Sequence, residues 1–243
     1  MDLLAIDTAT LRGSVAVVRG TPGPDAPAVE ILARRDALVT THSEMLLGLI
    51  DGALRDAGVA VTALGAVACG AGPGSFTGLR IGLTTAKGLC FAAALPLVLG
   101  SSLRALALRA VPAAPDRLIV AVLDAKKGEV YGGFYRGPAA APAAPEVAMS
   151  PAAFARHAAA VAAGAPVLLC GDGAATYAAE LRAALPLASF AALAGASGAE
   201  DTPGAVEIGR LGLERLATDG PADLASAAPA YVRPSEAELK RPK

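Results

Sequence analysis

The stretch Gly70-Ala-Gly-Pro-Gly-Ser-Phe-Thr-Gly-Leu-Arg-Ile-Gly82 joins a buried-strand pattern, Leu64 to Cys69, to a long apolar helix pattern, Phe76 to Ala94. Glycines in the turn permit backbone angles that other residues avoid. Gly78 and Gly82 lie inside the helix pattern, where each costs about 1 kcal/mol relative to alanine. Because a helix with that penalty needs a close neighbour, the stretch predicts a strand, a tight turn and a helix packed against another backbone.

This turn does not fit either common phosphate-binding motif. A Walker A loop ends in Gly-Lys-Ser/Thr, and the chain contains no Gly-Lys dipeptide. The dinucleotide fingerprint fails because Ser75 stands where its third glycine belongs. The pattern therefore favours a tight strand-to-helix connection, although a helix N-terminus after a strand can still hold an anion.

Two helix patterns carry faces that neither core nor solvent explains well. At 3.6 residues per turn, the glycine-bearing side of the second helix can pack on a sheet. Its other side mixes apolar residues with two bases: Phe76, Leu79, Arg80, Leu83, Thr84 and Lys87. The outer side of the first helix, from residue 42 to 57, bears Met45, Gly48, Gly52 and Arg55. We interpret both as docking surfaces; an ordinary solvated face is the alternative for the first helix.

Composition limits the class of protein. The chain has 243 residues, of which 54% are hydrophobic and 18% charged, so general disorder is excluded. Its net charge of −1 leaves no basic face apart from a few residues in the tail, so any contact with RNA is expected only through a partner. The longest apolar run is interrupted by Pro96 and the start lacks a signal-peptide pattern, which predicts a cytoplasmic protein with no membrane segment.

Three unclustered cysteines, Cys69, Cys90 and Cys170, lie in apolar surroundings. This arrangement argues against a disulfide framework or a zinc site and predicts buried thiols.

The order of predicted elements repeats. An apolar strand ending in Asp7 is followed by a turn and a returning strand, and another ending in Asp124 is followed by a turn at 125–128 and a strand, Glu129 to Arg136. We interpret this as an internal duplication. Two βββαβα halves predict an α/β fold of the actin-like (ASKHA, RNase H-like) class, with two lobes of mixed sheets flanked by helices.

We expect an N-terminal lobe at 1–103 and a reduced C-terminal lobe at 104–204. The helix and tail at about 205–233 are expected to return to the first lobe. Residues 137 to 145 are expected to form a loop.

In an actin-like fold the two strand-end aspartates face a cleft and position a metal-bound nucleotide. Asp7 and Asp124 would be that pair, and Gly171 and Gly173 would form the turn on the adenosine side. The alternative is that both aspartates only accept hydrogen bonds from turn backbones. The residues alone leave this open.

Five stretches together resemble the TsaB (YeaZ) family, from residue 2 to about residue 233. The Gly-Pro-Gly-Ser-Phe-Thr-Gly run is the most specific of them, while residues 137–204 carry almost no family pattern. The stretches are Leu4-Ala-Ile-Asp-Thr-Ala-Thr10, His42-Ser-Glu-x-Leu-Leu47, Gly72 to Gly82, Asp124-Ala-x-x-Gly-Glu-Val-Tyr131 and Pro229-Ala-Tyr-Val-Arg233.

The resemblance implies a non-catalytic scaffold subunit in the synthesis of N6-threonylcarbamoyladenosine at position 37 of tRNA. Its implied partners are the catalytic paralogue TsaD and the TsaE ATPase, with a homodimer in isolation and tRNA bound only indirectly. No catalytic residue, metal or cofactor of its own is implied; ATP and magnesium would be held by partner subunits. Ser102 and Leu106 stand where the paralogue carries its metal-binding histidines.

The resemblance also implies that the two helices form a bundle with the equivalent pair of the paralogue or of a second copy. The expected partner-interface residues are His42, Met45, Gly48, Leu49, Gly52, Arg55, Phe76, Leu79, Arg80, Leu83, Thr84 and Lys87. On this hypothesis, Leu83→Glu is expected to break partner binding and leave the fold intact.

Two other functions remain open from the sequence. The first is a stand-alone actin-like ATPase or small-molecule kinase that uses Asp7 and Asp124. The second is a homodimeric binding protein without an enzyme partner.

Overall fold

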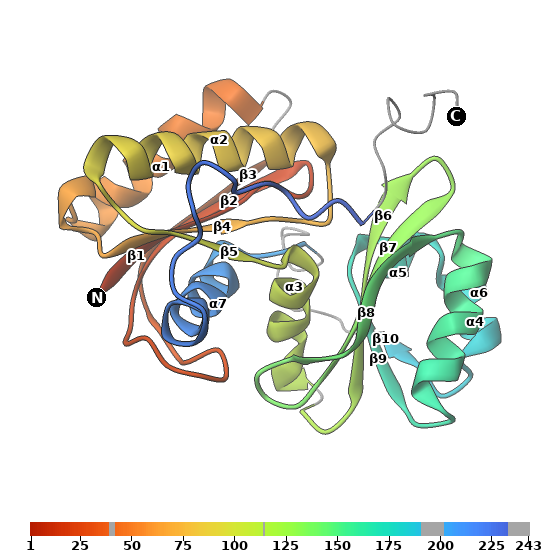
Figure 1. The fold of residues 1–243 in the computed structure, drawn as a ribbon. Helices are drawn as coiled ribbons and strands as arrows, with labels where there is room; N and C mark the ends of the chain where they lie inside the picture. Colours follow the sequence, from red (N-terminus) through yellow and green to blue (C-terminus); the bar gives the residue numbers. More distant parts are fainter. Residues whose placement is uncertain (39–41, 114, 191–201, 233–243) are drawn as a thin grey trace.

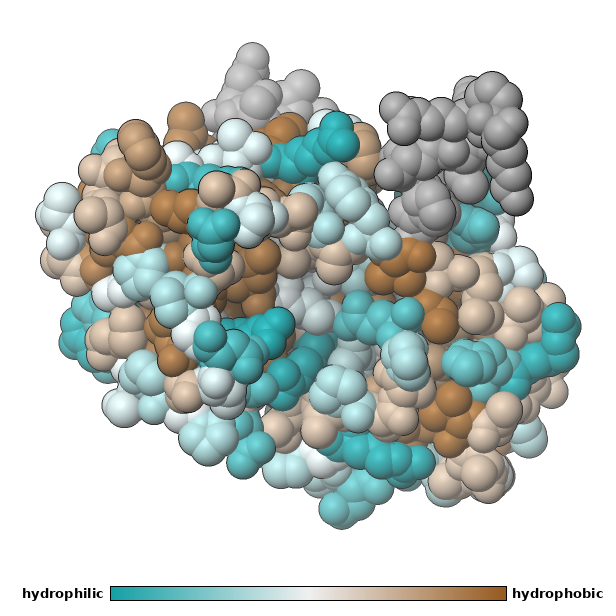
Figure 2. All heavy atoms as spheres, viewed as in Figure 1, coloured by the Kyte–Doolittle hydropathy of each residue, from teal (hydrophilic) through white to brown (hydrophobic). Residues whose placement is uncertain are grey.

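The computed structural model describes residues 1–38, 42–113, 115–190 and 202–232, with only the backbone at 42–44. Within these residues the chain forms two mixed five-stranded sheets with helices on their faces (Figure 1). The face shown in Figure 2 mixes hydrophobic and hydrophilic residues, as expected when 54% of all residues are hydrophobic.

The first sheet has the strand order β3-β2-β1-β4-β5. β1 pairs antiparallel with β2 and parallel with β4. The first pair is a hairpin, whereas the connection that leads to β4 includes a helix. Its strands are β1 (Asp2–Asp7), β2 (Arg12–Arg19), β3 (Glu30–Leu38), β4 (Ala66–Gly70) and β5 (Leu97–Gly100).

The second sheet repeats this topology with the order β10-β9-β6-β7-β8. β6 pairs antiparallel with β7 and parallel with β9, as β1 does with β2 and β4. Its strands are β6 (Leu118–Lys126), β7 (Glu129–Arg136), β8 (Ala141–Met149), β9 (Val167–Cys170) and β10 (Ser189–Phe190). The equal strand orders confirm the predicted duplication and the two-lobed fold class.

Helices cover both sheets and fill the space between them (Figure 1). α1 (His42–Ala57) and α2 (Phe76–Ala93) lie on one face of the first sheet and α7 (Ala205–Thr218) on the other, against β1, β2, β4 and β5. α3 (Ser102–Ala110) packs between α7 and the second sheet. The remaining helices are α4 (Pro151–Ala162), α5 (Asp172–Thr176) and α6 (Ala178–Ala184), with short 3₁₀ turns η1 (Val61–Ala63) and η2 (Val111–Ala113).

The predicted loop at 137–145 is wrong, because residues 141–149 form β8. β8 lies at the edge of its sheet, where prolines such as Pro142 and Pro145 are tolerated since one side of the strand needs no ladder hydrogen bonds. α7 packs on β1, β2, β4 and β5 of the first sheet, while the lobe bounds stay a prediction; the expected boundary at 103/104 falls inside α3.

The glycine-rich turn packs as tightly as its composition predicts. A Cβ on Gly78 would meet the carbonyl oxygen of Thr8, and one on Gly82 would meet the Thr8 hydroxyl, which itself donates to the Gly78 carbonyl at 2.8 Å. Of the turn glycines only Gly72 has a positive φ, +103°, so Gly74 is required instead by lack of space beside Ala9. The start of α2 is thus fixed against the loop that follows β1.

The thiols of Cys69, Cys90 and Cys170 are buried, as predicted, and none of the three forms a disulfide. Burial raises the pKa of the Cys90 thiol to about 11, so it stays protonated at neutral pH. No helix in the described ranges is long and apolar enough to cross a membrane.

Candidate functional site

A cleft of about 560 Å³ opens between the lobes, at the ends of β1 and β6. The loop after β1 forms one wall, the turn into α2 another, and the β6–β7 hairpin with the start of α5 a third. Its lining residues are Ala9, Thr10, Leu11, Arg12, Leu38, Gly74, Ser75, Phe76, Leu123, Asp124, Ala125, Lys126, Tyr131, Asp172 and Thr202. Open α/β sheets place ligand sites in this position, at the carboxyl ends of their strands.

Asp124 lines the cleft and is held by its own hairpin. Its Oδ1 accepts a hydrogen bond from the Lys126 backbone at 2.8 Å, and its Oδ2 pairs with Lys126 Nζ at 2.8 Å. Its backbone N–H donates to Asp172 Oδ1 at 3.0 Å, and burial raises the pKa of that second carboxyl. The carboxylate of Asp124 is therefore neutralised by the chain's own lysine.

Asp7 does not line the cleft, which corrects the expectation of a facing aspartate pair. Its side chain is fully buried: Oδ2 accepts from Ser102 Oγ at 2.7 Å and Oδ1 from the Ala9 backbone at 2.9 Å. Burial raises the pKa of Asp7 to about 6. A Cβ on Gly70 would collide with the carboxylate, so Asp7 closes the space between β1, β4 and α3 instead of facing a ligand.

Gly171 and Gly173 support the cleft from behind. Gly171 has φ +103° and lies against the Val122 carbonyl, while a Cβ on Gly173 would meet the backbone of Leu123 and Asp124. It is Asp172, between them, that reaches the cleft. Sequence reasoning missed Asp172, although its place in the Gly-Asp-Gly turn was the available signal.

The positions where the paralogue's metal ligands would stand belong to the core. Ser102 is buried on Asp7 and Leu106 is fully buried between the sheets. In the part of the chain that the structure describes, no group of three His, Cys, Asp or Glu side chains could hold a metal ion.

The predicted partner-interface residues divide into exposed and internal ones. Met45, Gly48, Arg55, Phe76, Arg80 and Thr84 are exposed. Leu49, Gly52 and Lys87 are half-buried, and Gly52 is covered by the guanidinium of Arg35, which is paired with Asp56 at 2.7 Å. The side chain of His42 lies outside the described residues.

Leu79 and Leu83 are internal, which contradicts the expectation that they form an outer face. Only 2% of Leu79 and 4% of Leu83 is exposed, and Leu83 belongs to the core between α1, α2 and the first sheet. The glycine-bearing side of α2 is buried as predicted. The buried stripe is wider than expected, because it also includes the leucines beside the glycines. Leu83→Glu consequently tests the core and not an interface.

The outer stripe of α2 instead contains Thr84, Gly88 and Phe91. Phe91 is 85% exposed, and nothing lies within 4 Å of a Cβ placed on Gly88 or on Gly48 of α1. Leu47 of α1 is 59% exposed. Neither Phe91 nor Leu47 was predicted for this face, although Phe91 follows Thr84 by seven residues, a helical repeat that could have identified it.

One flank of α2 is covered by the chain's own tail strap, which we define as residues 221–232 and which runs along α2 towards the second lobe (Figure 1). Lys87 Nζ donates to the carbonyl oxygens of Ala225 at 3.4 Å and Ala227 at 3.2 Å. Arg80 stacks on the Phe76 ring at 3.8 Å and donates to Tyr231 Oη at 3.1 Å. Arg80 and Lys87, which were predicted to contact a partner, therefore bind the tail strap.

Tyr231→Ala is expected to cost about 1 kcal/mol of stability, because it removes the ring contact with Phe76 at 5.4 Å and the acceptor for Arg80. Hydrogen exchange of the Ala230 N–H, which is bonded to the Ala71 carbonyl at 2.8 Å, should accelerate in the variant. Unchanged exchange there would mean that backbone contacts alone hold the strap.

Comparisons with known proteins agree with this architecture. A family model described as "TsaD: tRNA N6-adenosine threonylcarbamoyltransferase" matches residues 37–239. The chain is 39% identical over 132 residues to the tRNA threonylcarbamoyladenosine biosynthesis protein TsaB of Haemophilus influenzae, which is 54% of this chain and 52% of that protein. It is 37% identical over 137 residues to TsaB of Escherichia coli, 56% of this chain and 55% of that protein.

These matches span about half the length of the curated relatives. The solved structure of YeaZ from Pseudomonas aeruginosa superposes with a TM-score of 0.74 at 28% identity and covers 95% of this chain and 100% of that chain. The sequence matches and the shared two-lobed fold together show that the chain belongs to the TsaD-related family as a TsaB (YeaZ) homologue.

Proposed function

We propose that this chain is a non-catalytic scaffold subunit in the synthesis of N6-threonylcarbamoyladenosine at position 37 of tRNA. It binds the catalytic paralogue TsaD through the outer stripes of α1 and α2 and helps to recruit the TsaE ATPase. ATP and magnesium are held by these partners, and tRNA is contacted through the complex. In isolation the same stripes pair two copies of the chain.

The observation that carries the proposal is the exposed apolar stripe with open glycine notches. Phe91 projects from α2 with 85% exposure, and Gly48 and Gly88 leave the surfaces of two neighbouring helices open. Glycines let a second pair of helices approach closely, and an exposed aromatic ring in such a position is a common anchor of protein interfaces. The similarity to TsaB proteins supplies the reaction system in which the partner is sought.

The geometry of the aspartates weighs against a stand-alone ATPase. The ATPase hypothesis needs Asp7 and Asp124 together in one cleft, whereas Asp7 is buried against Ser102 and Asp124 is paired with Lys126. Turnover of ATP by the purified chain that is lost in Asp124→Asn would support the ATPase and contradict the scaffold.

Phe91→Glu is expected to weaken binding of the TsaD paralogue at least tenfold, because the proposed interface would bury a charge in place of the exposed ring. Binding should be measured with purified proteins, together with tRNA modification in the reconstituted system. Since the ring is exposed in the free chain, the melting temperature should change by no more than about 2 °C.

Leu187→Glu is a matched control, because Leu187 is 61% exposed but lies in the second lobe, after α6. It should bind the paralogue like the unaltered chain. Equal binding by both variants would exclude the α1–α2 surface as the interface. Loss of self-association in Phe91→Glu without any change in tRNA modification would favour the homodimeric binding protein.

A further inference from the structure

A second cavity, of about 420 Å³, lies between the lobes and shares no lining residue with the first cleft. Its walls are the end of β5, the start of α3, the β7–β8 hairpin and the last turns of α7. The lining residues are Leu99, Gly100, Ser101, Arg104, Tyr135, Pro142, Glu146, Leu211, Glu214, Arg215, Thr218 and Asp219. Its volume is in the range of small-molecule sites.

Glu146 is the central polar group of this cavity. Its Oε1 accepts hydrogen bonds from Tyr135 Oη at 2.7 Å and from Ser101 Oγ. Burial raises the pKa of Tyr135 far above its ordinary value, so the phenol remains a donor at neutral pH. Both hydroxyls therefore orient one oxygen of the carboxylate, and Oε2 takes part in none of the hydrogen bonds among the described residues.

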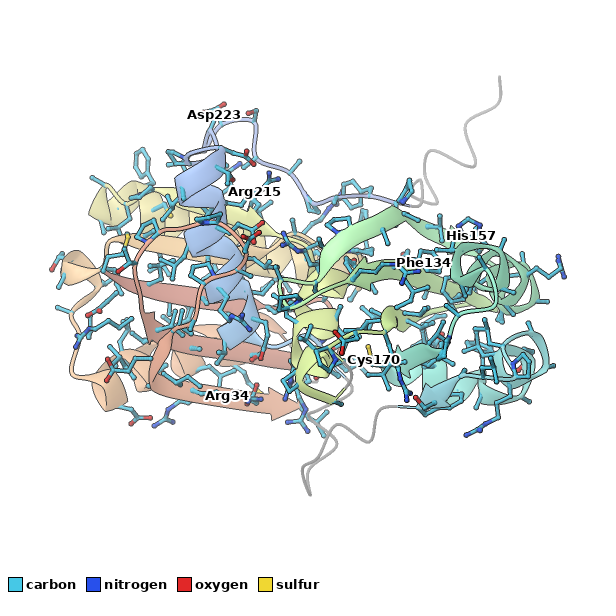
Figure 3. The ribbon with its side chains drawn as sticks, turned by 90° about the horizontal axis from the view of Figure 1, so that it is seen from below. Arg34, Phe134, His157, Cys170, Arg215 and Asp223 are labelled. Carbon is cyan, nitrogen blue, oxygen red and sulfur yellow. The ribbon has the colours of Figure 1, made fainter. Side chains whose placement is uncertain are left out.

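The neighbouring guanidinium groups are already committed elsewhere. Arg104 uses four of its five N–H groups, two on Glu214 at 2.7 and 2.9 Å and two on the carbonyls of Ala139 and Ala140 at 3.0 and 2.9 Å. Arg215, labelled on α7 in Figure 3, is paired with Asp219 one turn further along the helix. Neither guanidinium forms an ion pair with Glu146 among the described residues.

The formal charges of the lining leave one negative charge in excess, because three carboxylates (Glu146, Glu214, Asp219) face two guanidinium groups (Arg104, Arg215). Leu99, Pro142 and Leu211 supply apolar wall beside the carboxylate. A half-buried carboxylate whose orientation is fixed by two hydroxyl donors can form a well-oriented ion pair with a small cation. The lining therefore matches a positively charged donor with an apolar stem.

We propose that this cavity binds a small aliphatic amine, with the ammonium group donating to Glu146 Oε2 and the alkyl part against Leu99, Pro142 and Leu211. Glu146 is the recognition residue, and Tyr135 and Ser101 are positioning residues that fix its carboxylate. The site involves neither the α1–α2 surface nor any partner subunit, so it stands or falls independently of the scaffold function.

The experiment is a titration of the full, isotope-labelled chain with n-butylammonium chloride at pH 7 and constant ionic strength, followed by amide chemical shifts. We expect saturable shifts at Gly100, Ser101 and Glu146. The uncharged analogue n-butanol should bind at least tenfold more weakly to the unaltered protein. This comparison needs no variant, so it decides the proposal even where a substitution impairs folding.

Two variants of equal charge sharpen the result. Glu146→Gln keeps an acceptor for Tyr135 and Ser101 but removes the charge, and should weaken butylammonium binding at least tenfold. Glu180→Gln removes one charge from the exposed surface of α6 and should change binding less than twofold. Non-saturable shifts, equal binding of amine and alcohol, or equal loss in both variants would overturn the site and leave Glu146 a structural tie between β8 and α3.

Discussion

Leu83→Glu is expected to unfold the chain, with a loss of stability on the order of 5 kcal/mol or more. Leu83 is 4% exposed and packs in the core between α1, α2 and the first sheet. The substitution removes a buried apolar side chain. Truncating a buried leucine to alanine alone generally costs roughly 2–5 kcal/mol. It also places a carboxylate where no cation or hydrogen-bond donor compensates for lost water.

Thr84→Glu is the matched control for this prediction, since Thr84 is the next residue of α2 and is exposed. It should change the free energy of unfolding by less than about 0.5 kcal/mol. Urea unfolding followed by circular dichroism measures both variants. A folded Leu83→Glu chain with ordinary stability would return this position to the surface and contradict the packing of α2 described above.

Asp7→Asn is expected to stabilise the chain at neutral pH by up to about 3 kcal/mol. Burial raises the pKa of Asp7 from 3.8 to about 6. Each pH unit between the two values corresponds to about 1.36 kcal/mol. Asparagine has nearly the same shape, can accept from the Ala9 N–H and can donate to the Ser102 hydroxyl, but carries no charge to bury.

The direction in which stability changes with pH follows from the number of protons bound by the folded and unfolded states. Because the folded pKa lies above the unfolded one, the folded state binds more protons between about pH 4 and 6. Stability of the unaltered chain should therefore fall as the pH rises through this window and reach a plateau above it. Asp7→Asn should lack that fall, so the two proteins should be equally stable near pH 3 and differ most at pH 7 to 8.

Asp56→Asn provides the opposite case. The guanidinium of Arg35 lowers the pKa of the exposed Asp56 carboxyl, so its small contribution is present at neutral pH and lost as the pH falls. Chemical unfolding of the three proteins from pH 3 to 8 distinguishes these profiles. Destabilisation of Asp7→Asn at pH 7 would show that the fold requires the ionised form of Asp7.

Elements marked by local turn and capping chemistry were predictable. The strand predicted at Glu129–Arg136 is β7, with the same bounds, and the strand predicted to end at Asp124 is β6, which continues two residues further to Lys126. The helix expected from about residue 205 is α7. The start of α4 carries a similarly local signal, the Ser150 cap followed by Pro151. Their signals are local: alternation, capping and turn chemistry. Gly78 and Gly82, which follow the glycine-rich turn, were equally informative. Glycine inside a helix is unfavourable, so it predicts a close approach of another part of the chain.

Elements defined by tertiary surroundings were not predictable. α3 is buried on nearly every side between two sheets and α7, so its sequence, with Leu103, Leu106 and Leu108, shows no polar face. In the candidate cleft, Asp7 ends β1 as predicted, whereas Asp124 lies two residues before the end of β6. Which aspartate faces the cleft depends on its partner. Ser102 is brought to Asp7 by tertiary packing, and Lys126 is brought to Asp124 by the hairpin turn.

The position of α7 has a consequence for biosynthesis. The face of the first sheet opposite α1 and α2 is covered by residues 205–218, which a ribosome adds only after the whole second lobe. Until then Leu3, Ala5 and Val18 have no helix over them. The half that emerges first thus cannot close until the second lobe and α7 have been translated, and chaperones have their longest opportunity to act on that uncovered β-surface.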